Sequence, residues 1–438
     1  MRFRKLSALA GASALLIAAC STAPGAASPA ASTGASPAAS GSGAAPGDTS
    51  KGTVNIAIEL PQQGSELAAS QPIIDAVKLA VKDAGGAAGG YKIEIPQSVV
   101  FDDAKDGVHD PQTGAQNMGN IVTQDAVIAV IGPVNSSVAK VQIPISNEAG
   151  LLQCSPANTN EGLTKPEFGA LDIRKANPTK INYVRVVTTD DKQGPGAAKF
   201  ILETLGKKNV YIIDSTDTFG KGIADNFQHY LEANGGKTVA RDGAPKTTSD
   251  YTSLMTAAAA KKPEAIYFGG VTADGGARIL KAAVAAGMGD IPFIGPDGIF
   301  DGSATTKDSF LNLAGDLAKN AYATAAAIGD FPGRAEFEAK FKAEYGRDAT
   351  GYAATGYSCA QVVIDALKRA GTAGATDMKD LREKVRAAGV DTTVKYTSVI
   401  GEFSFDANGD TSQWIISFYG YDPAKKDWVF KSQLDFAK

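Results

Sequence analysis

The chain has 438 residues, of which 44% are hydrophobic and 21% are charged, and its formal net charge at pH 7 is −4. It has no stripe of Lys and Arg interleaved with aromatic residues, so nucleic acid is not an expected partner. The stretch from Gly52 to the C-terminus is too long for one small core, and it predicts two lobes.

The first 19 residues combine a cationic start with an apolar run from Leu6 to Ala19. This run is too short to remain in a bilayer of about 30 Å as a helix, and its order is typical of a removable export signal. The run ends in Ile-Ala-Ala-Cys20, which resembles the lipobox of bacterial lipoproteins, whose cysteine carries acyl chains that hold the protein on the membrane. The alternative is an ordinary secretory signal with an incidental cysteine.

Residues 20–51 are expected to form the lipidated cysteine and a disordered tether. Residues 21–47 consist only of Ser, Thr, Ala, Pro and Gly. Such a segment buries too little apolar surface to offset the entropy cost of ordering it. No later apolar run approaches 18 residues, so the rest of the chain is expected to be soluble outside the membrane.

Strands and helices alternate regularly from residue 54 onward. Residues 127–131 form an unbroken apolar run, typical of a parallel strand covered on both faces. Runs of strand-helix-strand units predict an α/β fold with two doubly wound parallel-sheet lobes. The predicted strands are 54–58, 91–95, 127–131, 151–152, 210–213, 238–240, 265–268 and 292–294, and the predicted helices are 72–84, 111–123, one after Ser136, 192–205, 220–233, 251–260 and 274–286.

The last third of the chain departs from this pattern. Helices are predicted at 336–345, 356–370 and 378–388, followed by strands at 401–405 and 414–419. Between those two strands, Asp406-Ala-Asn-Gly-Asp410 offers a calcium-site alternative, but it lacks the glycine and glutamate that a helix-loop-helix calcium loop needs. Asn408-Gly409 is more typical of a hairpin turn.

Other reactive residues give weak signals. Cys154 and Cys359 are candidates for a disulfide in an oxidising compartment, but their apolar neighbours favour two buried free thiols. His109 and His229 lack partners at metal-ligand spacing, so no metal is expected. Asp102-Asp103 is interpreted as a surface pair at a strand end.

No catalytic residues and no cofactor are expected. A Gly-x-Ser-x-Gly elbow, a Walker loop and paired catalytic carboxylates are all missing from the sequence. The chain is therefore predicted not to be an enzyme. A lipid-anchored hydrolase is the alternative, and the absence of a nucleophile–base pair from the sequence argues against it.

Several short motifs in fixed order resemble those of type I periplasmic binding proteins. More narrowly, they are similar to the branched-chain (leucine/isoleucine/valine) amino-acid binding proteins of ABC transporters. The motifs are Phe101-Asp102-Asp103, Val130-Ile-Gly-Pro-Val-Asn-Ser-Ser137, Ser155-Pro-Ala-Asn-Thr159, Gln193-Gly-Pro-Gly-Ala-Ala198, Phe219-Gly-Lys-Gly222, Gly295-Pro-Asp-Gly298 and Phe405-Asp-Ala-Asn-Gly-Asp410.

The resemblance implies a Venus-flytrap fold with three crossing strands, which we expect near 186–189, 323–326 and 401–405. Lobe 1 would then comprise 53–187 plus 325–400. Lobe 2 would comprise 188–324 plus 401–438.

A free amino acid needs donors for its carboxylate and acceptors for its ammonium, because burying either charge unpaired is costly. Ser136 opens a predicted helix, where its hydroxyl and the helix N–H groups suit a carboxylate; plain N-capping is the alternative. The resemblance makes Ser136 the carboxylate-binding serine, and Asp297 the partner of the ammonium. The same resemblance implies that the backbone of Ala157 contacts the ligand and that Thr159 contacts both its carboxylate and its ammonium. It also implies that Phe219 and Tyr352 line the pocket with aromatic rings, and that Val134 and Asn135 lie beside the ligand carboxylate.

Two departures from the family put strict leucine/isoleucine/valine specificity in doubt. Residues 60–70 have no aromatic where these proteins often have a tyrosine, and Val271 stands where another tyrosine is common. We expect an extracytoplasmic monomer, lipid-anchored to the bacterial cell membrane, that captures an amino acid by cleft closure and delivers it to an ABC transporter permease. The alternatives are an amide- or urea-binding receptor and a ligand sensor using the same cleft.

Overall fold

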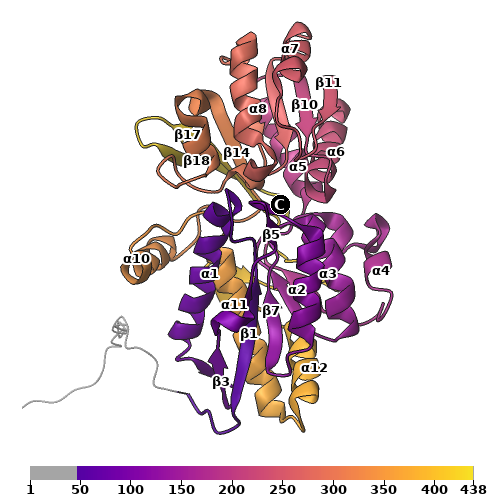
Figure 1. Cartoon of the computed structure of the whole chain (residues 1–438), viewed down its shortest axis with the longest axis vertical. Coiled ribbons are helices and arrows are strands. Elements are labelled where there is room, and N and C mark those ends of the chain that lie inside the picture. Colours follow the sequence, from indigo (N-terminus) through magenta and orange to yellow (C-terminus); the bar gives the residue numbers. More distant parts are fainter. Residues whose placement is uncertain (1–46, 438) are drawn as a thin grey trace, which may run out of the picture. The chain divides into compact units, whose positions relative to one another are not determined.

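The computed structural model describes residues 47–437. The predicted export signal (1–19), Cys20 and most of the predicted tether lie outside these residues. Two seven-stranded sheets form the cores of two lobes, which confirms the predicted α/β class with two lobes (Figure 1). In the described part of the chain, no helix has both the length and the apolar character needed to cross a bilayer.

The first lobe is built on the sheet β2-β3-β1-β7-β8-β9, and its seventh strand, β4 (Val100–Phe101), pairs with β1 beside this path. Its central strands β1 (Thr53–Glu59), β7 (Val127–Ile131), β8 (Leu152–Ser155) and β9 (Tyr183–Arg185) are parallel. Ile128 and Ile131 of β7 pack into the core under α1 (Glu66–Asp83) and α11 (Ala353–Ala373), whereas Val127 and Val130 pack against α2 (Pro111–Val122). Helices therefore cover both faces, which explains the unbroken apolar run of β7.

The second lobe is built on the sheet β11-β10-β12-β13-β14-β17-β18. Strands β11 (Lys237–Gly243), β10 (Asn209–Asp214), β12 (Ala265–Gly269), β13 (Phe293–Gly295) and β14 (Ala321–Ala325) are parallel. The last two strands, β17 (Ile415–Asp422) and β18 (Asp427–Asp435), add an antiparallel edge. One face packs on α5 (Asp190–Lys199) and α6 (Thr218–Ala233), and the other on α7 (Thr252–Ala260) and α8 (Gly276–Ala283).

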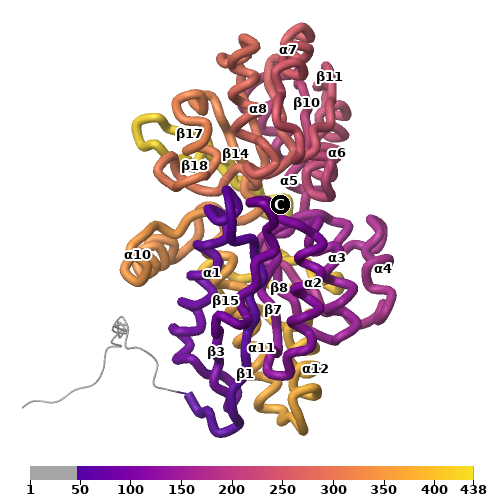
Figure 2. The backbone as a smooth tube through the Cα atoms, in the orientation of Figure 1, coloured from indigo at the N-terminus to yellow at the C-terminus, as the bar shows by residue number. Residues whose placement is uncertain are grey.

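The remaining elements complete the two lobes. The tube in Figure 2 shows α11 and α12, from late in the chain, returning beside the elements of the first lobe. The other strands are β2 (Ala87–Ala88), β3 (Tyr91–Glu94), β4 (Val100–Phe101), β5 (Ala104–Lys105), β6 (Val108–His109), β15 (Tyr396–Ser398) and β16 (Gly401–Phe403), and the other α-helices are α3 (Ser136–Glu148), α4 (Ala170–Ile173), α9 (Phe310–Ala314), α10 (Arg334–Tyr345) and α12 (Met378–Gly389).

The segments that pass between the lobes run side by side. The Thr188 N–H donates to the Ala326 carbonyl at 2.9 Å, and the Ser417 hydroxyl donates to the Ala327 carbonyl at 2.8 Å. The third passage lies later than predicted, because β16 pairs with β15 in a separate two-stranded sheet and the chain joins the second sheet only at β17. The predicted residue boundaries of the lobes stay a prediction.

The two internal cysteines form a disulfide, so the prediction of free thiols is wrong. Cys154 in β8 and Cys359 in α11 are joined by an S–S bond of 2.05 Å, and both are fully buried. Their apolar neighbours reflect the core between sheet and helix, and this environment suits a disulfide as well as a thiol. The sequence separation of 205 residues gave no sign that the two residues meet.

The acidic loop between β16 and β17 forms the predicted turn. The Gly409 N–H donates to the Asp406 carbonyl at 3.1 Å, and Phe405 pairs with Thr411 in antiparallel fashion. Gly409 has a φ of +90°, and a Cβ there would lie 2.2 Å from the Tyr183 carbonyl oxygen, so only glycine fits. Within residues 47–437, no cluster of three or more potential metal ligands is found.

Candidate ligand-binding cleft

A cavity between the two lobes collects residues from both. It holds about 590 Å³ of space free of protein atoms, including the part open to solvent. Phe300, Gly351 and Tyr352 also line a wider neighbouring groove that reaches α10. The cavity is lined by Ser65, Glu66, Ala69, Val134, Asn135, Ser136, Ala157, Thr159, Phe219, Val271, Thr272, Ala273, Asp297, Gly298, Phe300, Asp301, Gly351 and Tyr352.

All eight residues predicted to contact a ligand therefore line one cavity. Their binding roles stay predictions. Ser136 is the first residue of α3, as predicted, but the N-cap position belongs to Asn135. Plain N-capping thus does not explain the serine. Its buried Oγ accepts only a long 3.5 Å bond from the Asn160 N–H, and the hydroxyl proton remains to be donated.

The Thr159 side chain adds a second polar group at this end. Its Oγ1 is buried and has no partner with full hydrogen-bond geometry. The neighbouring Asp190 carboxyl is fully buried, which raises its pKa well above the usual range, although the Thr159 hydroxyl opposes that rise. The Thr159 hydroxyl can donate either to the Asp190 carboxyl or to a ligand oxygen, and its oxygen can accept a bond from a ligand ammonium.

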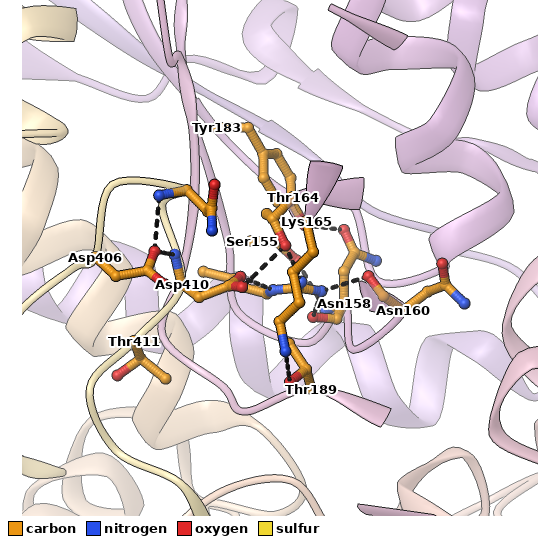
Figure 3. A network of polar contacts seen from close by, with 12 residues as sticks. Ser155, Asn158, Asn160, Thr164, Lys165, Tyr183, Thr189, Asp406, Asp410 and Thr411 are labelled. Atoms are coloured by element: carbon orange, nitrogen blue, oxygen red, sulfur yellow. Dashed lines mark hydrogen bonds and ion pairs between the residues drawn. The ribbon is translucent and has the colours of Figure 1, made fainter. Parts of the chain in front are cut away.

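An internal network fixes the loop that carries Ala157 and Thr159 (Figure 3). The Ser155 hydroxyl accepts hydrogen bonds from the Ala157 and Asn158 N–H groups at 3.3 and 2.9 Å. Nη1 of Arg185 donates to the carbonyls of Asn158 and Asn160 at 3.2 and 2.7 Å, one on each side of Thr159. Because these bonds hold the backbone, the direction of the Thr159 side chain is set before any ligand arrives.

Arg185 is itself held by a carboxylate from the hairpin turn. It is fully buried, and its Nε donates to Asp410 Oδ1 at 2.7 Å, while Thr164 contacts both its Nη2 and Asp410. Burial opposes the charge of Arg185, but the Asp410 carboxylate outweighs it and raises the pKa of the guanidinium. Asp410, a residue of the calcium-site alternative, therefore supports the loop that carries Ala157 and Thr159.

Asp297 lies on the opposite side of the cavity, at the start of the short helix η7 (Asp297–Ile299). Its Oδ2 accepts a 2.6 Å bond from the Tyr352 hydroxyl, and its Oδ1 accepts a 2.5 Å bond from Gln193 Nε2. Burial raises the pKa of Asp297 to about 6, and the two donors oppose the rise. Each carboxylate oxygen can accept a second bond, so the group can still receive an ammonium.

Tyr352 does more than line the cavity. Its hydroxyl holds Asp297 of the second lobe while it accepts a 3.3 Å bond from the Ala326 N–H in a segment that connects the lobes. The sequence predicted an aromatic wall at this position. The hydrogen bonds make it a contact between the lobes as well.

The structure contains a buried ionic contact beside the cavity that was not predicted from the sequence. Glu66 Oε1 lies 2.6 Å from His109 Nδ1, and His109 Nε2 lies 3.5 Å from Asp217 Oδ2. Burial disfavours the charged imidazole, but Glu66 and Asp217 outweigh burial and raise the pKa of His109 well above the usual value. Sequence offered no signal for this contact, because the three residues are far apart along the chain and become neighbours only through the fold.

The prediction that Asp102 and Asp103 form a surface pair is wrong for Asp103. Its side chain is fully buried, and burial raises its pKa well above the usual range, with Glu59 as the nearest acidic influence. Asp102 accepts a 2.7 Å bond from the Gln62 N–H. Asp102 thus organises the loop before α1, which leads to Glu66.

Comparisons with known proteins agree with this architecture. Residues 53–415 match the model of a family described as periplasmic binding protein, and the chain belongs to that family. Its class is that of non-catalytic solute-binding proteins.

Three proteins are similar to this chain over most of its length. A Leu/Ile/Val-binding protein, BraC3, of Rhizobium johnstonii is 27% identical over 76% of this chain and 82% of its own length. The crystal structure of a leucine binding protein, LivK, from Thermotoga maritima has a TM-score of 0.73 at 21% identity and covers 88% of this chain and 99% of that chain. A solute binding protein from R. palustris in complex with benzoate has a TM-score of 0.70 at 19% identity and covers 87% of this chain and 96% of that chain.

Proposed function

We propose that the protein captures a free amino acid in the cavity between its lobes and presents it to the permease of an ABC importer. One observation carries this proposal. Hydroxyl donors at Ser136 and Thr159 and the Asp297 carboxyl lie on opposite lobes and face one cavity. A ligand with a negative and a positive end close together satisfies both sides, and an α-amino acid has that form.

Contacts between the lobes support binding by closure. Tyr352 of the first lobe reaches Asp297 of the second, and Asn160 Nδ2 donates to the Thr218 carbonyl at 3.1 Å. A ligand that touches both lobes stabilises the closed form over the open one, because the open form lacks half of its contacts. The names of the relatives, which include leucine- and leucine/isoleucine/valine-binding proteins, favour the same class of solute.

Calorimetric titration of the twenty amino acids tests the proposal. At least one should bind, and S136A and D297N should weaken it by about tenfold or more, since each removes a hydrogen bond to a charged group. The exposed residues Ser432 and Asp290 provide the matched controls S432A and D290N. Binding that is unchanged in both site variants contradicts the proposed site. Binding of urea or short amides, but of no amino acid, points to the alternative receptor.

We also propose that the protein is exported, acylated at Cys20 and held on the outer side of the cell membrane as a monomer. The basis is the sequence from the cationic start to Ile-Ala-Ala-Cys20 and the Ala/Ser/Pro/Gly-rich segment after it. Metabolic labelling with a palmitate analogue should mark the wild type but not C20A. A labelled C20A protein, or an unlabelled wild type in the membrane fraction, contradicts this anchor.

A further inference from the structure

Besides Asp297, the carboxyl of Asp301 also lines the cavity, and an aliphatic amino acid has no side-chain group that could pair with it. Asp301 lines the cavity and is 4% exposed. Its Oδ1 accepts a 2.9 Å bond from the Phe310 N–H, whereas its Oδ2 is buried and has no partner with full hydrogen-bond geometry. The Thr272 hydroxyl is its other nearby donor, and a carboxylate has acceptor sites for more than two bonds, so Asp301 can still accept a bond from a ligand in the cavity that it lines.

Asp301 and Asp297 have different surroundings. Asp297 is held by Tyr352 and Gln193, and its acidic neighbour is Asp190. The neighbours of Asp301 are the Thr272 hydroxyl and the more distant charge of Glu66. Burial raises the pKa of Asp301 to about 7. The two carboxyls are thus separate acceptors within one cavity.

The charges around the cavity leave Asp301 without a counterion. Among residues 47–437, those that line the cavity include three acidic side chains and no Lys or Arg. Glu66 is paired with His109, and Asp297 has two neutral donors. Beside Asp301, the Thr272 hydroxyl is the neutral donor that opposes the rise in the pKa of the carboxyl, and it also lies 3.4 Å from the Gly298 carbonyl. An aliphatic side chain placed here would desolvate the carboxyl further and give it no donor.

We propose that the cavity selects amino acids whose side chain ends in a hydrogen-bond donor, a hydroxyl or an ammonium, which Asp301 accepts next to Thr272. This rests on the proposed function, in which Ser136, Thr159 and Asp297 hold the α-carboxylate and α-ammonium. Val271, Ala273 and Phe300 supply apolar contact for the rest of the side chain. An aromatic acid without an amino or hydroxyl group has no hydrogen-bond donor for Asp297 or Asp301, so the cavity disfavours it.

Two pairs of ligands test the proposal by calorimetry: threonine against valine, which have the same size, and lysine against norleucine, which has an unbranched chain without the terminal ammonium. We expect the donor-bearing member of at least one pair to bind about tenfold or more tighter than its apolar partner, because a site with a buried polar group rejects an analogue that cannot pair with it. D301N and T272V keep the size of each side chain and should reduce that preference to about threefold or less. D290N, an exposed aspartate in the same lobe, should leave it unchanged.

The outcomes separate this inference from the proposed function. If valine and norleucine bind as tightly as threonine and lysine, the donor selectivity is overturned while amino-acid binding stands. If no amino acid binds, the proposed function itself fails. A preference that survives in both D301N and T272V overturns the assignment to this pair. Should D301N not fold, as judged by its thermal melt, T272V and the wild-type ligand pairs still decide the matter.

Discussion

His109 Nε2 lies 3.5 Å from Asp217 Oδ2, so an ionic contact passes from the first lobe to the second beside the cavity. The other ring nitrogen lies 2.6 Å from Glu66, a residue of the cavity lining. Asp217 also caps α6 by accepting a 2.6 Å bond from the Gly220 N–H. The imidazole thus connects the start of α1 with the start of α6, and a charged His109 would stabilise this arrangement of the lobes.

The first prediction concerns the pH dependence of closure. The pKa of His109 is raised above its usual value of about 6.5. Its stabilising contribution is therefore complete below that value and is lost as the pH rises through the raised pKa. Small-angle X-ray scattering of the ligand-free protein should show the lobes opening with rising pH. The charged groups that face His109 are Glu66, Asp103, Asp217 and Asp274, and Lys246 binds its carbonyl at 2.7 Å.

H109Q should abolish this pH dependence and lower the free energy of unfolding by about 3 kcal/mol, because it leaves buried carboxylates without their cation. The control is H229Q, since His229 is exposed on α6. Urea denaturation measures the stability change. An H109Q protein that keeps both the wild-type scattering profile across the pH range and the wild-type stability contradicts the role of this contact.

The second prediction concerns proton release on binding. Burial disfavours the charge of Asp297 and raises its pKa to about 6. A ligand ammonium favours the charged form, so binding below about pH 6 must expel a proton, and affinity should rise between pH 5 and 7. Calorimetry in buffers of different ionisation enthalpy reports the released protons. Affinity that is flat or falls over this range, with no proton release, contradicts ammonium binding at Asp297.

The third prediction concerns Tyr352. Y352F removes a 2.6 Å hydrogen bond to the Asp297 carboxyl but keeps the ring. Because hydrogen bonds to charged groups contribute about 1.5–3 kcal/mol, ligand affinity should fall by about tenfold or more, and the pKa of Asp297 should rise further. The matched variant is Y230F, because Tyr230 is a half-buried tyrosine of α6 that is not among the residues lining the cavity. If Y352F binds like Y230F, the hydroxyl has no part in the site.

The fourth prediction concerns the buried pair Arg185–Asp410. D410N should destabilise the protein by about 3–5 kcal/mol, because Arg185 is fully buried and would lose its counterion. Breaking the exposed pair Lys199–Glu203 with K199M should change stability by no more than about 0.5 kcal/mol. Urea denaturation compares the two. An equal loss of stability in the two variants would mean that the Asp410 carboxylate does not stabilise the buried Arg185.

The fifth prediction concerns the disulfide. C359A should lower the free energy of unfolding by about 2–5 kcal/mol, because the bond Cys154–Cys359 closes a loop of 205 residues in the unfolded chain. The wild type under strongly reducing denaturing conditions should show the same loss. A mass spectrum with two free thiols in the oxidised, denatured wild type would contradict the bond.

Much of the fold was predictable because its signals are local. The apolar run of β7 and the regular spacing of strands and helices predicted parallel sheets, and residues 127–131 match β7. Short motifs with fixed chain positions, such as the one ending in Ser136 and Ser137, predicted where loops meet the carboxyl edge of the sheet. The cavity brings those motif residues together.

The contacts that the sequence did not predict share one physical feature: each joins residues that are far apart along the chain. Nothing near Cys154 indicates that α11 will place Cys359 against β8. Likewise, nothing around His109 indicates that Glu66 and Asp217 will meet it. Burial of Asp103 was missed because a carboxylate at a strand end is ordinarily solvated. Contacts of this kind depend on the packing of whole elements and not on any local pattern.

The most direct measurement is a crystal structure of the protein with the amino acid that binds most tightly in calorimetry. We expect the α-carboxylate within hydrogen-bond distance of the Ser136 and Thr159 hydroxyls, and the α-ammonium within hydrogen-bond distance of the Asp297 carboxyl. A ligand bound elsewhere, or one in the cavity that contacts neither Ser136 nor Asp297, would contradict the account.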